Sequence, residues 1–535
     1  MAVEQPKVNC QTNLSYYFTE YCDNSTIHGL KFIGERKRSF IEKVWWIVSV
    51  TFALYLCATM IKQTYKKWIN SPVIVSFATS ETPIWEIPFP AITICPLGKT
   101  DLTKFNFKEI SPGNYTEEEA ENLTSLALIC PMVLELFPAI NATRTIHDKA
   151  IDFLIDSVPD FDSSVRGCLW RNRFCDKESR KLFNPVLTSG AVCYSYNMLD
   201  WGDIYTDATD LDYYERLGIE HQSRSHWSPE DGYDENVKIN IYPRRTSMTG
   251  TNGGMEVVLQ TIVRDANYNC GDSLKGYKVM VHHPGEMPRF HQHYFWVPLD
   301  QLISVSIKPN MITTYGDLKS YKPWDRQCYF EEEKQLKYFK IYNQQNCLLE
   351  CLTNITFEKC GCVNFHMPRT DDMPLCGPAL LNCASSANDE FNRKRSSQRS
   401  HRYQDKSETF TDSTGCNCVP ACYSLRYDAE TSQLDWDWNN MLGVNKTFEE
   451  NQTVHLSRLR VFFKDMQFMT SERNELYGQT EFWANCGGLV GLFTGFSLIS
   501  FIEIVYFCSL RFICNLKRYG WRYWSGAEEL LNVRE

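Results

Sequence analysis

Two apolar segments, far apart in the chain, constrain the fold more than any other feature. The first runs from Val44 to Ile61 and holds no charge in eighteen residues, just enough for a helix that spans a bilayer. The second runs from Gly487 to about Phe512. A signal peptide is the alternative for the first, but it starts late and its Trp45–Trp46 pair suits a membrane interface. The sequence therefore predicts two membrane spans.

Two spans place both termini on one side. Basic clusters, ERKRS before the first span and LKRYGWR after the second, favour the cytoplasm, although KQTYKK after the first span opposes this. We expect a multi-pass plasma membrane protein with both termini cytoplasmic. The expected parts are a cytoplasmic arm at 1–42, a first transmembrane helix at 43–62, an extracellular domain at 63–481, a second transmembrane helix with the pore at 482–513 and a cytoplasmic tail at 514–535.

Cysteines and glycosylation sequons support this topology. Sixteen of the 22 cysteines lie between the spans, an even and dense set typical of disulfides in an oxidising compartment. Zinc is the alternative, but Cys360-x-Cys362 and Cys416-x-Cys418 lack the usual ligand spacing. Sequons at Asn13 and Asn24 would be cytoplasmic and unused. Six more sequons lie between the spans: Asn114, Asn122, Asn141, Asn354, Asn445 and Asn451.

The region between the spans mixes strand-like and helix-like segments. Residues Pro72–Thr79 and Gly276–Pro284 are rich in β-branched residues and predict strands. Residues Tyr329–Asn354 predict a helix in which Cys347 and Cys351, four apart, share a face. Two cysteines two apart in a strand also share a face, so the spacing predicts a ladder of stacked bridges.

The segment Ser385–Gly415 is polar and poor in apolar residues. It predicts a mobile loop tethered by Cys383 and Cys416. Its basic centre could be a protease site, but a solvated loop is the favoured interpretation.

Charge and motifs exclude other classes of protein. The formal charge of −10 argues against a nucleic-acid binder. The sequence holds no nucleophile elbow, HExxH, P-loop or dinucleotide fingerprint. We therefore expect no enzyme and no catalytic residue.

The second apolar segment has unusual contents for a membrane helix. Gly487, Gly491 and Gly495 are spaced at four, so they share one face and let backbones approach closely. A carboxylate, here Glu503, is costly in lipid and is typical of an ion path. Both interpretations can hold, because three closely packed helices can enclose a pore.

Four polar residues in this segment, Thr494, Ser497, Ser500 and Glu503, recur every three positions. In a regular helix each step falls about 60° short of a turn, so the face drifts by about 180° over three steps. Thr494 and Glu503 therefore cannot both face one axis from a straight helix. Either only some of them line a pore, or the helix breaks. A break at Gly495 would cost little free energy, because glycine adopts non-helical conformations easily.

Several short motifs follow in a fixed order. His28-Gly29 precedes the first span, and FPAITIC, Phe89 to Cys95, follows it. SYKPWDRQC leads into NCLLEC, CGC and GCNCVPAC, and WANCGGLVGLFTGFS opens the second span. In this order the motifs resemble the degenerin/epithelial sodium channel family, most closely its insect pickpocket branch, across nearly the whole chain.

The resemblance implies an α+β membrane protein with two transmembrane helices and a large disulfide-rich ectodomain, shaped like a clenched hand with a β-sheet palm and a helical thumb. It implies a sodium-selective, commonly amiloride-blocked channel, a homo- or heterotrimer with related subunits, with no cofactor besides the permeant Na⁺. It also implies seven disulfides: Cys95–Cys193, Cys168–Cys175, Cys328–Cys422, Cys347–Cys418, Cys351–Cys416, Cys360–Cys383 and Cys362–Cys376. The two cysteines left over, Cys130 and Cys270, then form an eighth pair, Cys130–Cys270.

The resemblance also assigns a selectivity filter. Gly495-Phe496-Ser497 matches the family's Gly-Ala-Ser or Gly-Ser-Ser pattern with Phe in the middle, and it favours a helix break there. Backbone carbonyls can face an ion whatever that side chain is. We expect Thr494 and Ser500 beside the pore and Glu503 in the cytoplasmic vestibule, attracting cations.

Further sites concern gating. Ala484 matches the family's degenerin position, where a small residue permits closure, and Asn485 follows it where acid-sensing relatives often have Asp. His28-Gly29 resembles the gating motif of the N-terminal arm, although an ordinary turn is the alternative. Trp324 matches an aromatic that couples the ectodomain to the first span, with a buried core tryptophan as the alternative.

Four histidines form a candidate metal site. HHPGEMPRFHQH holds His282, His283, His291 and His293, and two histidines on one strand face could bind Zn²⁺. Two prolines break up the geometry, so structural histidines are favoured and no metal is expected.

The sequence thus favours a sodium channel subunit gated by an extracellular stimulus. The alternative is a two-span receptor or adhesion protein without its own pore. An ATP-gated purinergic receptor is a rival channel, but that fold lacks the FPAxTxC and Gly-x-Ser pattern. Peptide, proton, osmotic, small-molecule and mechanical gating all stay open.

Overall fold

The chain folds into two compact units, each with its own packing. One comprises Met1–Ile74 with Asn474–Glu535, and the other comprises Val75–Arg473. The structure, a computed structural model, describes residues 9–70, 73–175, 183–216, 225–234, 241–270, 273–290, 293–401, 416–438, 454–476 and 478–531.

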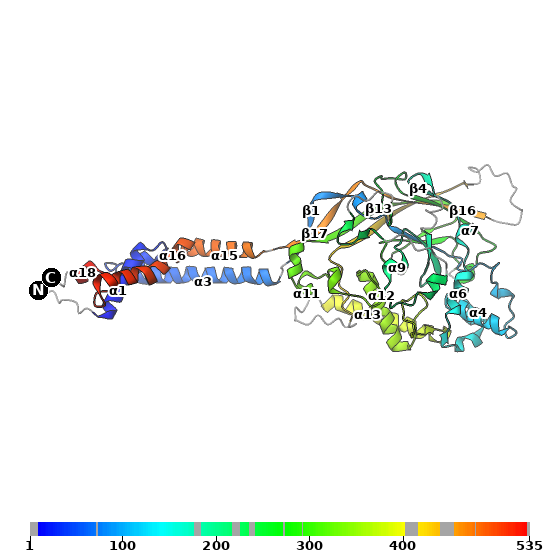
Figure 1. Ribbon diagram of the computed structural model, residues 1–535, viewed down its shortest axis with the longest axis horizontal. Coiled ribbons are helices and arrows are strands. Elements are labelled where there is room, and N and C mark those ends of the chain that lie inside the picture. Colours follow the sequence, from blue (N-terminus) through cyan, green and yellow to red (C-terminus); the bar gives the residue numbers. More distant parts are fainter. Residues whose placement is uncertain are drawn as a thin grey trace. The chain divides into compact units, whose positions relative to one another are not determined.

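The first unit is mainly helical. Its helix α3 (Phe40–Asn70) contains the first expected span and is longer than predicted. The segments Phe40–Ile69 and Leu498–Tyr519 are both long and apolar enough to cross a membrane. Helix α15 (Gln479–Thr494) lies alongside α3 (Figure 1), and the ring of Phe482 stacks on Trp68 with centroids 4.6 Å apart.

Shorter helices flank these two. The N-terminal arm holds α1 (Cys10–Asn24) and α2 (Leu30–Gly34). The C-terminal part continues from α15 as α16 (Leu498–Tyr506), a π-helical turn at Phe507–Arg511, α17 (Phe512–Tyr519) and α18 (Glu528–Leu531).

The second unit is built on an eight-stranded sheet. Its long central strand β13 pairs in parallel with β16 and β17 and antiparallel with β15, from Gln301 opposite Asp435 to Ile312 opposite Ser424. The strands in sheet order are β1 (Val73–Pro83), β17 (Gln467–Glu475), β13 (Gln301–Thr314), β16 (Val454–Phe463), β10 (Met255–Ile262), β4 (Val165–Trp170) and β5 (Arg173–Phe174), with β15 (Ser424–Asp435) beside β13.

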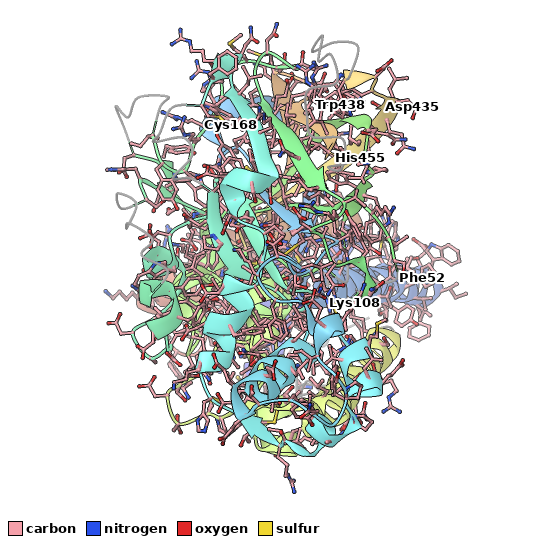
Figure 2. All side chains as sticks on the ribbon, turned by 90° about the vertical axis from the view of Figure 1, so that its right-hand side faces the viewer. Phe52, Lys108, Cys168, Asp435, Trp438 and His455 are labelled. Atoms are coloured by element: carbon pink, nitrogen blue, oxygen red, sulfur yellow. A yellow bond between two sulfur atoms is a disulfide. The ribbon has the colours of Figure 1, made fainter. Side chains whose placement is uncertain are left out.

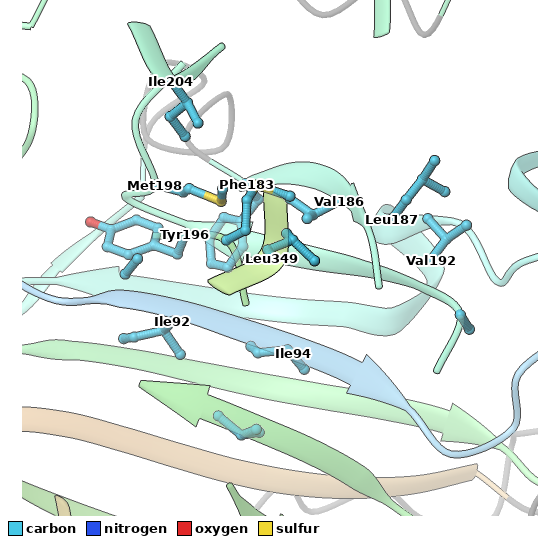
Figure 3. Packing of buried hydrophobic residues seen from close by; sticks show 14 of the residues in the cluster. Ile92, Ile94, Phe183, Val186, Leu187, Val192, Tyr196, Met198, Ile204 and Leu349 are labelled. Carbon is cyan, nitrogen blue, oxygen red and sulfur yellow. The ribbon is translucent and has the colours of Figure 1, made fainter. Parts of the chain in front are cut away.

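A five-stranded sheet contributes to the core of the second unit. Its order is β12 (Phe295–Val297), β11 (Tyr277–His282), β2 (Ala91–Pro96), β7 (Val192–Tyr196) and β6 (Phe183–Leu187). Apolar residues of β2, β6 and β7 pack with Leu349 of a neighbouring helix (Figure 3). The strands predicted at Pro72–Thr79 and Gly276–Pro284 are confirmed as β1 and β11.

Asp300 holds three strand ends together at one end of the larger sheet. One of its carboxylate oxygens accepts from Nε1 of Trp438 at 2.8 Å, and the other pairs with Nδ1 of His455 at 2.6 Å. Trp438 and His455 lie at the same end of the domain (Figure 2). The start of β13 is thereby tied to the segment after β15 and to the start of β16.

The helices of the second unit include α4 (Glu117–Ala127), α6 (Lys149–Asp156), α12 (Gln344–Cys360) and α13 (Leu381–His401).

The helix predicted over Tyr329–Asn354 is right only from Gln344 onward. Asn343 caps α12 by accepting from the amide of Asn346 at 2.7 Å. Before it the chain is irregular, because Tyr338 and Phe339 are buried and the Tyr338 carbonyl accepts from the amide of Thr206.

The loop predicted over Ser385–Gly415 is wrong in its first half, which forms most of α13. Ala384, Ala387 and Phe391 are buried on one face of this helix, so three apolar residues at helical spacing anchor a mostly polar segment. Lys359 of α12 pairs with Glu390 at 2.8 Å. Residues 402–415 lie outside the described residues.

Eight disulfides pair the cysteines of this unit in the way that the resemblance implies. The helical face shared by Cys347 and Cys351 serves two bridges, to Cys418 and Cys416. Cys360 ends α12, and neither Cys360-x-Cys362 nor Cys416-x-Cys418 lies in a strand. The other six bridges are Cys95–Cys193, Cys130–Cys270, Cys168–Cys175, Cys328–Cys422, Cys360–Cys383 and Cys362–Cys376.

Candidate functional site

The second apolar segment is interrupted where the sequence predicts a break. Helix α15 ends at Thr494, and Gly495 follows in the left-handed region with φ of 68°. The Gly495 amide donates to the carbonyl oxygen of Gly491 at 2.8 Å, which closes the last turn. The residues from Gly495 to Ser497 are non-helical. The Ser497 carbonyl accepts from the amide of Phe501 at 3.1 Å, and the described hydrogen bonds include none to the carbonyls of Gly495 and Phe496.

The helix restarts because Ser497 caps it. The Ser497 hydroxyl accepts from the amide of Ser500 at 3.3 Å, and the Ser500 hydroxyl accepts from the amide of Ser497 at 3.1 Å. This reciprocal capping box satisfies donors at the start of α16. The S-x-x-S pattern at 497–500 was the available sequence signal for the restart.

The N-terminal arm contacts the break directly. The amide of His28 donates to the carbonyl oxygen of Thr494 at 2.9 Å. A Cβ added to Gly495 would lie 2.7 Å from Cδ2 of His28. The structure therefore brings the predicted gating motif and the predicted filter into contact, and the close approach requires glycine at position 495.

Gly29 has its own packing requirement. Its φ is 87°, and an added Cβ would lie 2.7 Å from Cγ2 of Val50 in α3. The arm thus turns sharply at Gly29 and packs on the first long helix, where the ring of Phe32 stacks on Trp46 at 4.4 Å.

Thr26 joins the same site, and the sequence offered no signal for it. Its hydroxyl lies 2.7 Å from the hydroxyl of Ser500 and donates to Oε2 of Glu503 at 3.0 Å. Its amide donates to the same carboxylate oxygen at 3.2 Å. Glu503 is therefore half-buried against the arm of its own chain.

The four polar residues of the segment do not form one free stripe on the single chain. Thr494 is buried, and its hydroxyl donates to the carbonyl of Val490 at 2.7 Å. Ser500 is 1% exposed, whereas Ser497 is exposed. The break and the contacts of the arm together place Thr494, Ser500 and Glu503 against the same chain.

The predicted gate residues occupy an open face of α15. Ala484 and Asn485 are exposed on the single chain. A Cβ added at Gly487 or Gly488 would meet nothing within 4 Å. This face of α15 therefore has room for another helix.

Trp324 lies in the short helix α11 (Pro323–Arg326) of the second unit. Its side chain is 53% exposed, so the buried-core alternative is wrong. The neighbouring Arg326 is buried instead, donates to the carbonyls of Leu318, Tyr321 and Cys328, and pairs with Glu333. The role of Arg326 was not predicted from the sequence.

His282 and His283 have structural roles, whereas His293 is exposed. Nε2 of His282 lies 2.7 Å from the Thr93 hydroxyl, and its Nδ1 lies 2.9 Å from the carbonyl of His283. Nδ1 of His283 accepts from the amide of Gly285 at 3.0 Å. Burial lowers the pKa of His282 to about 4 and that of His283 to about 3. His291 lies outside the described residues, and among those described no group of three His, Cys, Asp or Glu could hold a metal ion.

The sequons differ in accessibility. Asn114 and Asn354 are exposed, and Asn122 is half-buried. The Asn141 side chain, Asn445 and Asn451 lie outside the described parts of the chain.

Comparisons with known proteins identify the family of the chain. A family model described as "Amiloride-sensitive sodium channel" matches residues 21–507. Pickpocket protein 28 of Drosophila melanogaster is 28% identical over 524 residues, covering 95% of this chain and 81% of the relative.

Two further relatives span nearly the same length. Sodium channel protein Nach of Drosophila melanogaster is 24% identical, and the match covers 94% of this chain and 88% of that relative. Acid-sensing ion channel 1A of Danio rerio is 23% identical, and the match covers 90% of this chain and 86% of that relative. With two apolar membrane helices, a disulfide-rich second unit and a family match over most of its length, the chain belongs to the amiloride-sensitive sodium channel family, whose members are cation channel subunits.

Proposed function

We propose that this protein forms a sodium-selective, amiloride-sensitive pore whose filter is Gly495-Phe496-Ser497. The interruption of an apolar helix at these residues carries the proposal, because it leaves the carbonyls of Gly495 and Phe496 outside the two helix ladders in a segment otherwise suited to lipid. Thr494 and Ser500 lie next to the filter, and Glu503 attracts cations below it. Na⁺ is the permeant ion, and no cofactor takes part.

The proposed topology places Val75–Arg473 outside the cell and both termini in the cytoplasm of a plasma membrane protein. Eight disulfides and the exposed Asn114 and Asn354 support an extracellular location for this unit. The spans are 43–62 and 482–513, with the ectodomain at 63–481 between them, the cytoplasmic arm at 1–42 and the tail at 514–535.

The proposed assembly is a trimer with copies of itself or with related subunits. The open surface at Gly487 and Gly488 supports close approach of neighbouring α15 helices, because glycine lets backbones come together. Ala484 and Asn485 then face the axis as the gate.

The proposed stimulus acts on the extracellular unit and reaches the spans through the turn that carries Trp324. Its exposed ring is available for a contact, and the buried Arg326 holds the turn in a fixed shape. A stimulus panel of peptides, acid, osmotic change, small molecules and force, with amiloride as the control, identifies the gating signal.

Whole-cell recording with sodium replaced by an impermeant cation tests the channel function. We expect an inward current that depends on sodium and is reduced by amiloride, alone or with related subunits. Surface labelling in the same cells is the control. Surface protein that carries no cation current in any combination would instead favour the two-span receptor without a pore.

A further inference from the structure

A buried polar cluster joins the two ends of the chain. Asn13 of α1 is 2% exposed, and Ser525 after α17 is 1% exposed. The hydroxyl of Ser525 donates to Oδ1 of Asn13 at 2.7 Å, and the Ser525 amide donates to the same atom at 3.3 Å. Nδ2 of Asn13 donates back to the carbonyl of Arg522 at 3.0 Å, and Nδ2 of Asn515 donates to the carbonyl of Ser525 at 3.1 Å.

Aromatic and charged contacts extend this cluster along α1. The Tyr17 ring lies 5.5 Å from that of Trp524, and the Tyr17 hydroxyl donates to the carbonyl of Phe507 in the π-helical turn at 2.5 Å. Glu20 pairs with Arg511 at 2.5 Å. We call the contact of α1 with residues 521–526 the clasp.

The clasp and the helix break are connected by one short segment. Six residues after Glu20, Thr26 holds Ser500 and Glu503, and His28 then contacts Thr494. The arm is therefore fixed by the tail at one end and by the break at the other. Loosening the clasp frees one of these two attachments.

We propose that Ser525 is a phosphorylation site whose modification opens the clasp. A phosphate on its oxygen removes the proton that is donated to Asn13 and adds a charge of about −2 with three acceptor oxygens. The present partner atom, Oδ1 of Asn13, is itself an acceptor, and the Ser525 side chain has no exposed space. The closed clasp and the phosphorylated serine therefore exclude one another.

The surrounding sequence suits a basic-directed serine kinase. Arg522 lies three residues before Ser525, and Lys517 and Arg518 precede it. Ser525 lies in the short segment between α17 and α18, so local opening of that segment exposes the serine. In the reaction, Ser525 Oγ bonds to the γ-phosphorus of ATP while the bond to the leaving ADP oxygen breaks, and the hydroxyl proton passes to the kinase base.

This inference rests on the proposed cytoplasmic location of the tail, where ATP and kinases are found. A direct test uses the purified full-length protein in detergent, which does not depend on topology or current. An arginine-directed serine kinase and ATP are added, and Ser525 phosphate is followed by mass spectrometry.

Three variants separate the burial of Ser525 in the clasp from recognition of its flanking sequence by the kinase. Asn13→Ala removes the clasp's central side chain, and we expect Ser525 phosphorylation about tenfold faster than in the wild type. Asn24→Ala, an exposed position on the same helix that bonds within it to the Glu20 carbonyl, is the matched control with the wild-type rate. Arg522→Gln keeps the backbone contact with Asn13 but loses kinase recognition, so phosphorylation is lost.

Hydrogen exchange of residues 10–24 gives the second readout. In phosphorylated wild-type protein we expect faster exchange in α1, and in Ser525→Ala treated with kinase we expect no change. Equal phosphorylation rates in wild type and Asn13→Ala would overturn the proposal, as would no Ser525 phosphate in Asn13→Ala or unchanged exchange after modification.

Discussion

The backbone amide of His28 donates a hydrogen bond to the carbonyl oxygen of Thr494 over 2.9 Å. Thr494 ends α15, where the last carbonyls of a helix have no partner within it. The partner comes from the opposite end of the chain. The shape of the break between α15 and α16 therefore depends on the N-terminal arm.

Gly495→Ala should disrupt the break. The added Cβ would lie 2.7 Å from Cδ2 of His28 at a residue with φ of 68°, and the left-handed conformation alone costs about 1 kcal/mol or more. We expect surface protein with little or no current in whole-cell recording. Because His28→Ala removes the ring, the double variant should recover part of the current. A normal current from Gly495→Ala would show that this contact does not shape the pore.

Glu503→Gln should lower single-channel conductance at low salt. In the proposed vestibule the carboxylate would concentrate cations near the pore, and this effect weakens as salt screens the charge. We expect a conductance reduced about twofold at low ionic strength and little changed at high ionic strength. Equal conductance at low salt would defeat the vestibule role.

Thr26→Val tests the hold of the arm on the same carboxylate. The change keeps the size of the side chain but removes the hydroxyl that contacts Ser500 and Glu503. Losing hydrogen bonds to a charged group costs about 1.5–3 kcal/mol, so we expect altered opening probability with conductance close to normal. Thr19→Val, whose hydroxyl bonds only within its helix to Ser15, is the control. Gating identical in both variants contradicts a role for Thr26.

Ala484→Val should give a sustained current. Ala484 is exposed on α15, so in the proposed trimer a larger side chain would meet a neighbouring subunit rather than its own chain. Ala484→Ser adds one small atom and should still close. A Val variant that closes normally would refute the gate assignment.

The second unit should lose stability in acid. Burial lowers the pKa of His282 to about 4 and of His283 to about 3, below the ordinary 6.5. The unfolded chain therefore binds more protons between these values, and stability is lost as pH falls through this window. Burial raises the pKa of Glu286 to about 7, and this carboxyl has the opposite effect, stabilising most at low pH and losing its contribution as pH rises.

Thermal unfolding from pH 7.5 to 4.5 measures the net effect of these three groups on stability, because over about this range their protonation differs between the folded and unfolded states. Two histidines outweigh one glutamate, so we expect the free energy of unfolding to fall by about 1.4 kcal/mol for each pH unit below pH 6.5. His282→Gln should flatten the acid loss, and Glu286→Gln should steepen it. A slope unaffected by either change would mean that these groups do not titrate as buried residues.

Local patterns in the sequence determined the main architecture. Uncharged apolar residues from Val44 to Ile61 predict a membrane helix because no charge has to be desolvated. The spacing of Cys347 and Cys351 set two sulfurs on one helix face, and the bridges to Cys418 and Cys416 use that face. The three-residue spacing of Thr494, Ser497, Ser500 and Glu503 meant that they could not all face one axis from a straight helix, and the helix breaks at Gly495.

Tertiary contacts decided what the local patterns left open. A polar composition at Ser385–Gly415 indicated a loop, yet burial of Phe391 and the contact with α12 made its first half helical. Residues Tyr329–Asn343 looked helical, but Tyr338 and Phe339 enter the core from an irregular chain.

The same holds at the site. Nothing near Thr26 or His28 in sequence indicates that they contact Ser500 and Thr494. Their pairing is non-local, and its free energy depends on two chain ends meeting, which periodicity and propensity within a short window cannot encode.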